Sequence, residues 1–334
     1  MIDTQLESLM KERHIPGLAI AIQRGDTILH EGYYGYANLE HQVAVNAQTV
    51  FEIASVTKLF TTQAILRLAQ EDKLKLADTL TQHVAGLPEA WKAVTIEHCL
   101  AHQSGIPNYT SLDRYWELQR VDKSPNQVLD LVHDLPLTFP SGTRHSYDNT
   151  GFYLLGMIIE SVTGKSYGEY LQATIFTPLG MTSTRANNYD QIIPHRAQGY
   201  NYRDGDFYNK GFYDVSNTFS AGVLLSNVQD LLTWKSALFD DRILNASYRK
   251  LWWTEHLSAE ANEKAYHYTL GLGWFAVESP LGTFWGHNGG ITGFASSFFY
   301  LPETQTTGIV LCNSNAFESP HQIALDVIAQ LDKS

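Results

Sequence analysis

Residues 51–58 read FEIASVTK, and the apolar stretch that they open continues to about residue 74. Apolar side chains recur in this stretch at helix-like spacing: Leu59, Ile65, Leu66, Leu68. The spacing predicts a helix over 55–74, with Ser55 at its N-terminus and Lys58 one turn later on the same face. A helix N-terminus favours developing negative charge, which suits a nucleophilic serine. The alternative is an N-cap serine beside a solvated lysine.

Two further Ser-x-x-Lys pairs, Ser8/Lys11 and Ser247/Lys250, make the bare pattern a weak signal. Ser8 falls late in a charged helix predicted over residues 3–13, and Ser247 falls in a polar stretch. Only Ser55 opens an apolar helix, so we assign the nucleophile to it.

Residues 164–168 read GKSYG and match the G-x-S-x-G elbow of other serine hydrolases. That elbow needs a strand before the serine, whereas a helix is predicted over 152–162. Gly164 instead fits a helix C-cap, and Ser166 with Glu169 fits a capping box. We interpret this motif as structural.

A second polar element, Tyr147-Asp148-Asn149, precedes a predicted helix. A phenol near an ammonium has its phenolate favoured and can act as a general base. The Asn149 amide can hold a substrate carbonyl and contact Lys58. The same Tyr-x-Asn pattern at residues 36–38 reads as strand.

A third element, HNGG at residues 287–290, follows an aromatic strand predicted over 283–286. Its glycines, Gly289 and Gly290, allow a substrate backbone to approach the strand closely. His287 is the ionisable member of this element.

Taken in order, Ser55-x-x-Lys58, Tyr147-x-Asn149 and His287-x-Gly289 resemble the motifs of the penicillin-recognising serine hydrolases. The chain is most similar to the branch that holds class C β-lactamases, D,D-carboxypeptidases, D-aminopeptidases and β-lactamase-like esterases. The resemblance runs from about residue 10 to residue 330, and residues 99–105 (CLAHQSG) also take part in it.

The resemblance implies a mechanism and a set of roles. Ser55 attacks an ester or amide carbonyl, and Lys58 and Tyr147 share the proton relay, with Tyr147 as the base. The backbone N–H groups of Ser55 and Gly290 hold the oxyanion. A substrate-positioning role falls to the remaining motif residues: Asn149, His287, Gly289. The mechanism needs no metal and no organic cofactor.

One departure from the family pattern bears on the substrate. β-Lactamases of this branch usually carry Lys-Thr-Gly at the third element, where this chain has His287-Asn288-Gly289. A lysine supplies a permanent positive charge for a substrate carboxylate, whereas histidine is charged only part of the time near pH 7. We therefore expect an esterase or a D-amino-acid peptidase. A class C-like β-lactamase and a non-catalytic penicillin-binding sensor or scaffold stay open as alternatives.

The order of predicted elements indicates the fold. A β-hairpin is predicted around Gly25-Asp26, helices and turn-rich loops fill the middle, and short aromatic strands with a final helix close the chain. We expect an α+β protein of the β-lactamase/transpeptidase-like class, in which residues 1–75 and 231–334 form one antiparallel sheet with flanking helices. Residues 76–230 form a mostly helical domain, and a cleft between the two parts forms one catalytic unit.

Composition limits the partners. The formal net charge is −12, with Lys+Arg 23 against Asp+Glu 35, which argues against a nucleic-acid or anionic-membrane partner. We expect a small ester, peptide or β-lactam substrate. The two cysteines, Cys99 and Cys312, exclude a disulfide-stapled scaffold and a four-thiolate metal site. The N-terminal residues lack the apolar core of a signal peptide, so we expect a cytoplasmic protein, or a secreted one if a leader was removed.

Several other residues receive structural interpretations. His98 and His102 have i, i+4 spacing on a predicted helix, which suits zinc only with a third ligand, and we interpret them as packing residues. His145 is close to Tyr147 in the sequence and could tune it, but we interpret it as a surface residue. The aromatic residues of 109–116 and of 252–253 are interpreted as core, with an acyl pocket as the alternative.

Overall fold

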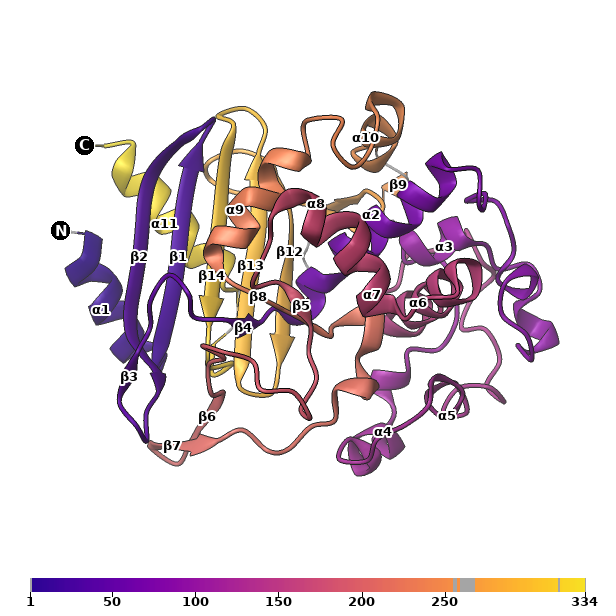
Figure 1. The fold of residues 1–334 in the computed structure, drawn as a ribbon, viewed down its shortest axis with the longest axis horizontal. Coiled ribbons are helices and arrows are strands. Elements are labelled where there is room, and N and C mark those ends of the chain that lie inside the picture. Colours follow the sequence, from indigo (N-terminus) through magenta and orange to yellow (C-terminus); the bar gives the residue numbers. More distant parts are fainter. Residues whose placement is uncertain (1, 255–256, 259–267, 318, 334) are drawn as a thin grey trace.

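The computed structural model describes residues 2–254, 257–258, 268–317 and 319–333. β1 (Gly17–Arg24) and β2 (Thr27–Asn38) form the expected hairpin, with Gly25 at its turn in the left-handed region (φ 54°). β14 (Thr306–Cys312) pairs antiparallel with the other side of β1. Strands from both ends of the chain therefore lie side by side, as Figure 1 shows.

The described strands of the main sheet follow the order β3-β2-β1-β14-β13-β12-β11-β10-β9, with antiparallel pairing throughout. The bounds of its other strands are β3 (Val43–Ala44), β9 (Leu257–Ser258), β10 (Tyr268–Leu270), β11 (Phe275–Val277), β12 (Phe284–Ile291) and β13 (Phe294–Leu301). This arrangement confirms the α+β class and the sheet built from both chain ends.

Both faces of the sheet are buried at β1. In β1, Leu18, Ile20 and Ile22 point into a core with α1 (Ile2–Glu12) and α11 (His321–Leu331). Ala19 and Ala21 point the other way, into the core that contains α2 (Thr57–Gln70) and α9 (Val228–Ala237). Figure 1 shows α1 and α11 on one side of the sheet and α9 on the other. Because each face meets a helical layer, β1 is apolar along most of its length rather than alternating.

The middle of the chain is mostly helical, as expected. It forms the group of helices beside α2 in Figure 1, with bounds α3 (Ile96–Leu100), α4 (Asp113–Leu118), α5 (Pro125–Leu129), α6 (Asn149–Thr163), α7 (Tyr167–Leu171) and α8 (Thr177–Leu179). α10 (Ala246–Trp252) follows α9. Small strands add a sheet of β4 (Phe51–Glu52), β8 (Leu224–Ser226) and β5 (Arg185–Ala186), and a hairpin of β6 (Tyr200–Arg203) and β7 (Asp206–Asn209). The division at residues 75 and 231 stays a prediction.

Two strands lie against the turn that holds Ser55. The strand expected over 283–286 continues through the HNGG element, so β12 runs to Ile291. Gly289 of β12 lies against the backbone of Ile53, whose carbonyl oxygen also accepts a hydrogen bond from Ser296 of β13 at 2.7 Å. This close approach joins the third sequence element to the first.

No helix within the described ranges is long and apolar enough to cross a membrane.

The two glycines of the third element make a matched pair for a stability test. A Cβ at Gly289 would collide with the carbonyl oxygen of Ile53 and with the Ser296 hydroxyl, whereas a Cβ at Gly290 meets nothing within 4 Å. We expect Gly289→Ala to lower the free energy of unfolding by about 1–3 kcal/mol, because strand and turn must move apart. Gly290→Ala should leave it nearly unchanged. Urea denaturation followed by circular dichroism measures both, and equal unfolding midpoints would contradict the close approach.

Candidate active site

Ser55 lies in a short turn between β4 and α2. Residues Ala54–Val56 form a 3-10 turn, and α2 begins only at Thr57. Ala54 has a φ of 44°, a left-handed conformation that is costly for a residue with a Cβ and is typical of strained functional sites. The side chain of Ser55 makes no capping bond at the start of α2. The N-cap alternative is therefore not what the structure shows.

The Ser55 hydroxyl instead meets the other two motif side chains. Lys58 Nζ donates to Ser55 Oγ at 3.1 Å, and the Tyr147 hydroxyl donates to the same oxygen at 2.8 Å. Both groups thus lie within hydrogen-bond reach of the serine hydroxyl, and a deprotonated Lys58 Nζ can accept the Ser55 proton along the same 3.1 Å contact. The structure thus brings together three side chains that are remote in the sequence.

Lys58 is fully buried in α2. Its Nζ also donates to the carbonyl oxygen of Ala221 at 2.7 Å. Burial lowers the pKa of Lys58 well below its usual value, and the charge of Asp148 opposes this shift. Because the neutral amine is the form that accepts a proton, the lowered pKa suits Lys58 to the role of base.

Tyr147 lies in the loop before α6, and Lys58 Nζ lies 5.0 Å from the centre of its ring. Burial raises the pKa of Tyr147 above its usual value, the hydrogen bond with Ser55 opposes this, and the charge of Asp148 raises it further. The net direction is opposite to the expected stabilisation of the phenolate. At neutral pH Tyr147 is therefore a phenol that donates a hydrogen bond.

Asp148 and His102 support Tyr147, and the sequence interpretation gave neither a role in the site. The Asp148 carboxylate caps α6 by accepting from Thr150 N–H at 2.7 Å and Gly151 N–H at 2.9 Å. Ser104 Oγ donates to it at 2.7 Å. Burial raises its pKa to about 6.

His102 binds the chain on both sides of Tyr147. Its carbonyl oxygen accepts from Ser146 N–H at 2.9 Å, and its Nδ1 accepts from Asp148 N–H at 3.1 Å. Its buried ring lies 4.7 Å from the Tyr147 ring, centre to centre. The sequence did indicate that this stretch matters, since residues 99–105 resemble the family, but it did not show which groups His102 contacts.

His102 lies beyond α3, which ends at Leu100, so the expected i, i+4 placement of His98 and His102 on one helix is wrong. The surface position expected for His145 is also wrong, because it is half-buried with its ring 5.8 Å from that of His102. Asn149 departs from expectation as well: its amide N–H donates to Thr110 Oγ1 at 2.9 Å, and the hydrogen bonds of Lys58 Nζ go to Ser55 Oγ and the Ala221 carbonyl oxygen instead.

His287 is buried in β12 beside Tyr147, with the two ring centres 6.1 Å apart. Burial, with the nearby Lys58 ammonium, lowers the His287 pKa to about 3. The third element therefore carries a neutral imidazole at neutral pH. It supplies no permanent charge, and less charge than an ordinary histidine would.

Two cavities meet at Ser55. The narrow cavity, of about 190 Å³, is lined by aromatic residues of the 109–116 stretch together with Ser55, Asn149 and Gly290. The wide cavity, of about 650 Å³, is lined by Ser55, Tyr147, β12, Asn315, Phe317 and residues 319–321. The aromatic residues of 109–116 thus serve as pocket walls as well as core. By contrast, Trp252 is core, and Trp253 lines a separate hollow.

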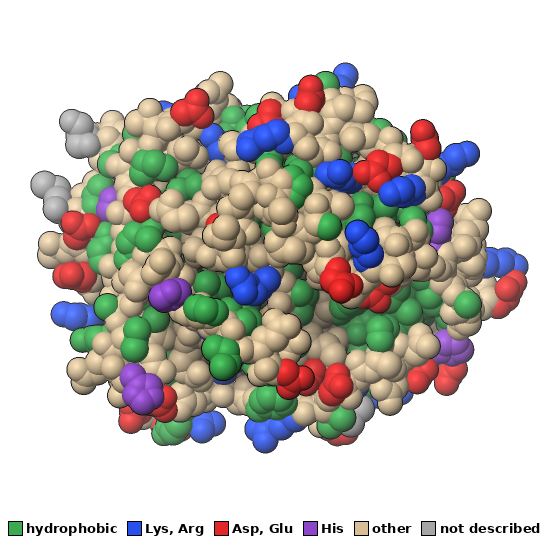
Figure 2. All heavy atoms as spheres, in the orientation of Figure 1, with side chains coloured by type: hydrophobic (Ala, Val, Ile, Leu, Met, Phe, Trp, Pro, Cys, Tyr) green, Lys and Arg blue, Asp and Glu red, His purple; other side chains and the backbone are tan. Residues whose placement is uncertain are grey.

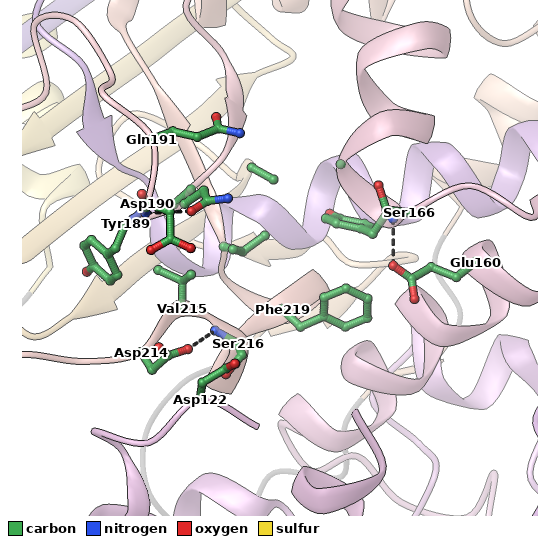
Figure 3. Close-up of a pocket in the computed structure, with 16 residues that line it drawn as sticks. Asp122, Glu160, Ser166, Tyr189, Asp190, Gln191, Asp214, Val215, Ser216 and Phe219 are labelled. Carbon is green, nitrogen blue, oxygen red and sulfur yellow. Dashed lines mark hydrogen bonds between the residues drawn. The ribbon is translucent and has the colours of Figure 1, made fainter. Parts of the chain in front are cut away.

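The competing serine motifs lie elsewhere. Gly164 ends α6 with a φ of 65°, and Ser166 forms the expected capping box with Glu169. Ser166 lines a third cavity of about 580 Å³, the acidic cavity, which Figure 3 shows with the carboxyl groups of Asp122, Glu160, Asp190 and Asp214 around it. Ser8 Oγ donates within α1 to the Thr4 carbonyl oxygen.

Comparison with known proteins agrees with the fold. The family described as "Beta-lactamase" matches residues 2–333. "Protein flp" of Staphylococcus aureus is 33% identical over 331 residues, which cover 94% of this chain and 63% of that protein. The chain thus spans less than two thirds of the length of that curated relative.

Two solved structures share the architecture. The octameric penicillin-binding protein homologue from Pyrococcus abyssi has a TM-score of 0.87 and 27% identity, with 100% of this chain and 77% of that chain covered. The D-amino acid amidase from Ochrobactrum anthropi SV3, crystallised with L-phenylalanine amide, has a TM-score of 0.83 and 25% identity, with 100% and 99% covered. With its family match over nearly the whole length, the chain belongs to the beta-lactamase family.

Proposed function

We propose that the protein is a serine hydrolase that cleaves carboxylic esters or amides through an acyl-enzyme on Ser55. The observation that carries this proposal is the contact of one hydroxyl oxygen with an amine at 3.1 Å and a phenol at 2.8 Å. A nucleophile within hydrogen-bond reach of its base is the signature of covalent acyl transfer.

Lys58 and Tyr147 carry out different proton transfers, because burial lowers the pKa of Lys58 and raises the pKa of Tyr147. The neutral Lys58 amine takes the Ser55 proton while Oγ bonds to the substrate carbonyl carbon. The N–H groups of Ser55 and Gly290 hold the oxyanion, as the family resemblance implies. When the carbonyl–leaving-group bond breaks, the Tyr147 phenol gives its proton to the leaving group, and the Lys58 ammonium compensates the phenolate. Water then attacks the acyl-enzyme. The Tyr147 phenolate takes a proton from the water, and the Lys58 ammonium returns its proton to Ser55 Oγ as the acyl group leaves.

Esterase or D-amino-acid peptidase activity fits the site better than β-lactamase activity. The neutral, buried His287 stands where the family's β-lactamases have a lysine for the substrate carboxylate. Kinship in fold to a D-amino acid amidase supports the hydrolase class. A penicillin-binding sensor would form the Ser55 adduct without turnover.

Removal of the nucleophile tests the proposal directly. Ser55→Ala should abolish hydrolysis of p-nitrophenyl esters and D-amino-acid anilides. It should also abolish labelling by a fluorophosphonate probe, measured by intact-mass spectrometry. Tyr147→Phe should keep the labelling but lower kcat by about 10²–10⁴-fold, because general acid–base catalysis contributes on that order. Undiminished turnover in Ser55→Ala would exclude the assignment, and an adduct without any turnover would favour the sensor.

The pH dependence of kcat/KM should follow Lys58. As the base must be unprotonated, kcat/KM should fall as the pH drops through the Lys58 pKa. Asp148→Asn removes the charge that raises this pKa and should move the acid limb to lower pH by about half to one unit. His287→Gln is the control and should leave the limb in place, because the His287 pKa is already about 3. If the acid limb disappeared in His287→Gln, the limb would belong to His287, and its assignment to Lys58 would be wrong.

His102 should act as a positioning residue for Tyr147. His102→Leu removes the Nδ1 acceptor for Asp148 N–H, so we expect kcat to fall about tenfold or more with little change in KM. His102→Asn places an amide oxygen where Nδ1 was and should recover much of that loss. Steady-state kinetics on variants with wild-type circular dichroism measure this, and an equal loss in both variants would point to packing alone.

A further inference from the structure

The two cavities at Ser55 share an unusual lack of charge. Building on the proposed function, we propose that the substrates are uncharged esters or amides, with a compact apolar acyl group in the narrow cavity and a larger apolar leaving group in the wide cavity.

The walls of the narrow cavity are uncharged and combine four aromatic side chains with neutral polar ones. None of its described lining residues is Lys, Arg, His, Asp or Glu. The hydroxyls of its tyrosines are already partnered: Tyr109 donates to the Asn217 carbonyl oxygen at 2.6 Å, and Tyr115 and Tyr213 bond each other. The rings are therefore left to contact a ligand. At about 190 Å³ the cavity is well below the ~300 Å³ lower end of drug-sized sites, so it fits a compact group.

Five apolar residues line the wide cavity: Phe275, Val277, Phe284, Ala295 and Phe317. The ionisable groups among its described lining residues are two histidines and Tyr147. Burial lowers the pKa of His321, and that of His287 lies at about 3, so both imidazoles are neutral near pH 7. Tyr147 is a phenol there because its pKa is raised.

The residues that line only one of the two cavities indicate which cavity holds the acyl group and which holds the leaving group. Ser55 and Gly290 line both cavities, which places the reacting carbonyl at their junction. Tyr147, the proposed donor to the leaving group, lines only the wide cavity, and Asn149 lines only the narrow one. The leaving group therefore occupies the wide cavity and the acyl group the narrow cavity.

A charged substrate would lose its hydration without gaining a counter-ion from the described lining residues of either cavity, which is costly. The chain does gather charge elsewhere. Figure 2 shows acidic and basic side chains interspersed over one face, and the acidic cavity of Figure 3 brings four carboxylates together. A formal net charge of −12 further disfavours anionic substrates. The neutral walls around Ser55 thus contrast with the charged groups elsewhere in the described part of the chain.

Pairs of substrates that match in shape and differ in charge test the acyl side. p-Nitrophenyl 4-methylpentanoate matches p-nitrophenyl hemisuccinate, and isobutyryl p-nitroanilide matches D-alanyl p-nitroanilide. Within each pair we expect kcat/KM to favour the neutral member by about 10²-fold or more, after correction for alkaline hydrolysis rates. Charged members within about threefold of their neutral partners would overturn the inference. If Ser55-dependent turnover of every substrate were absent, the proposed function itself would fail instead.

A gain of charge tests the leaving-group side. Val277 is half-buried on β11 and lines the wide cavity. We expect Val277→Lys to raise kcat/KM for 4-carboxyphenyl 4-methylpentanoate relative to the phenyl ester by about tenfold. Val277→Met, similar in length without the charge, should leave this ratio unchanged. An unchanged ratio in Val277→Lys, with the phenyl ester still hydrolysed, would overturn the placement of the leaving group in the wide cavity.

Discussion

The burial of the Lys58 amine is the constraint on which the rest of the site depends. An ammonium taken out of water without a carboxylate in contact is unstable, and the polar contacts of Lys58 are the Ala221 carbonyl oxygen and Ser55 Oγ. The amine therefore releases its proton more readily than a surface lysine would. Burial comes from the position of α2, which lies between the main sheet and α6 with nearly all of its residues inaccessible to water. The core that stabilises the fold thus also lowers the pKa of the residue that we propose as the base.

The pairing of strands from the two chain ends also shapes the site, because it sets the position of β12 next to Ser55. β14 joins β1, which fixes β13 and β12 next to it and brings β12 against the turn before α2. Gly289 allows this approach because it has no side chain, and Ser296 closes it with a hydrogen bond to Ile53. On the other side, His102 anchors both neighbours of Tyr147. Ser55 is therefore flanked by β12 on one side and by the Tyr147 loop, held by the buried His102, on the other.

Much of this could be predicted from the sequence, and the failures have physical causes. Periodicity and turn residues placed the hairpin, α2, α6 and α11, because these elements bury one regular face or end at a glycine or proline. The three motifs identified the residues that meet at Ser55. The protonation states were not accessible, because the pKa shifts of Lys58, Tyr147 and His287 arise from burial, which depends on the whole fold. The role of His102 was missed because its partners are backbone groups of a remote loop, and backbone bonding leaves little trace in side-chain identity.

Burial also explains why a neutral residue suits position 287. The imidazole is nearly inaccessible to water, so burial is the largest cause of its lowered pKa, and Lys58 lowers that pKa further whenever its Nζ is protonated. A lysine there would need either an open, hydrated approach or the carboxylate of a bound substrate as its counter-ion. Phe275, packed 5.1 Å from the imidazole, closes that approach with an apolar ring. The neutral histidine at position 287 and the apolar wall of the wide cavity therefore have one physical cause, burial, and both agree with the proposal of an uncharged substrate.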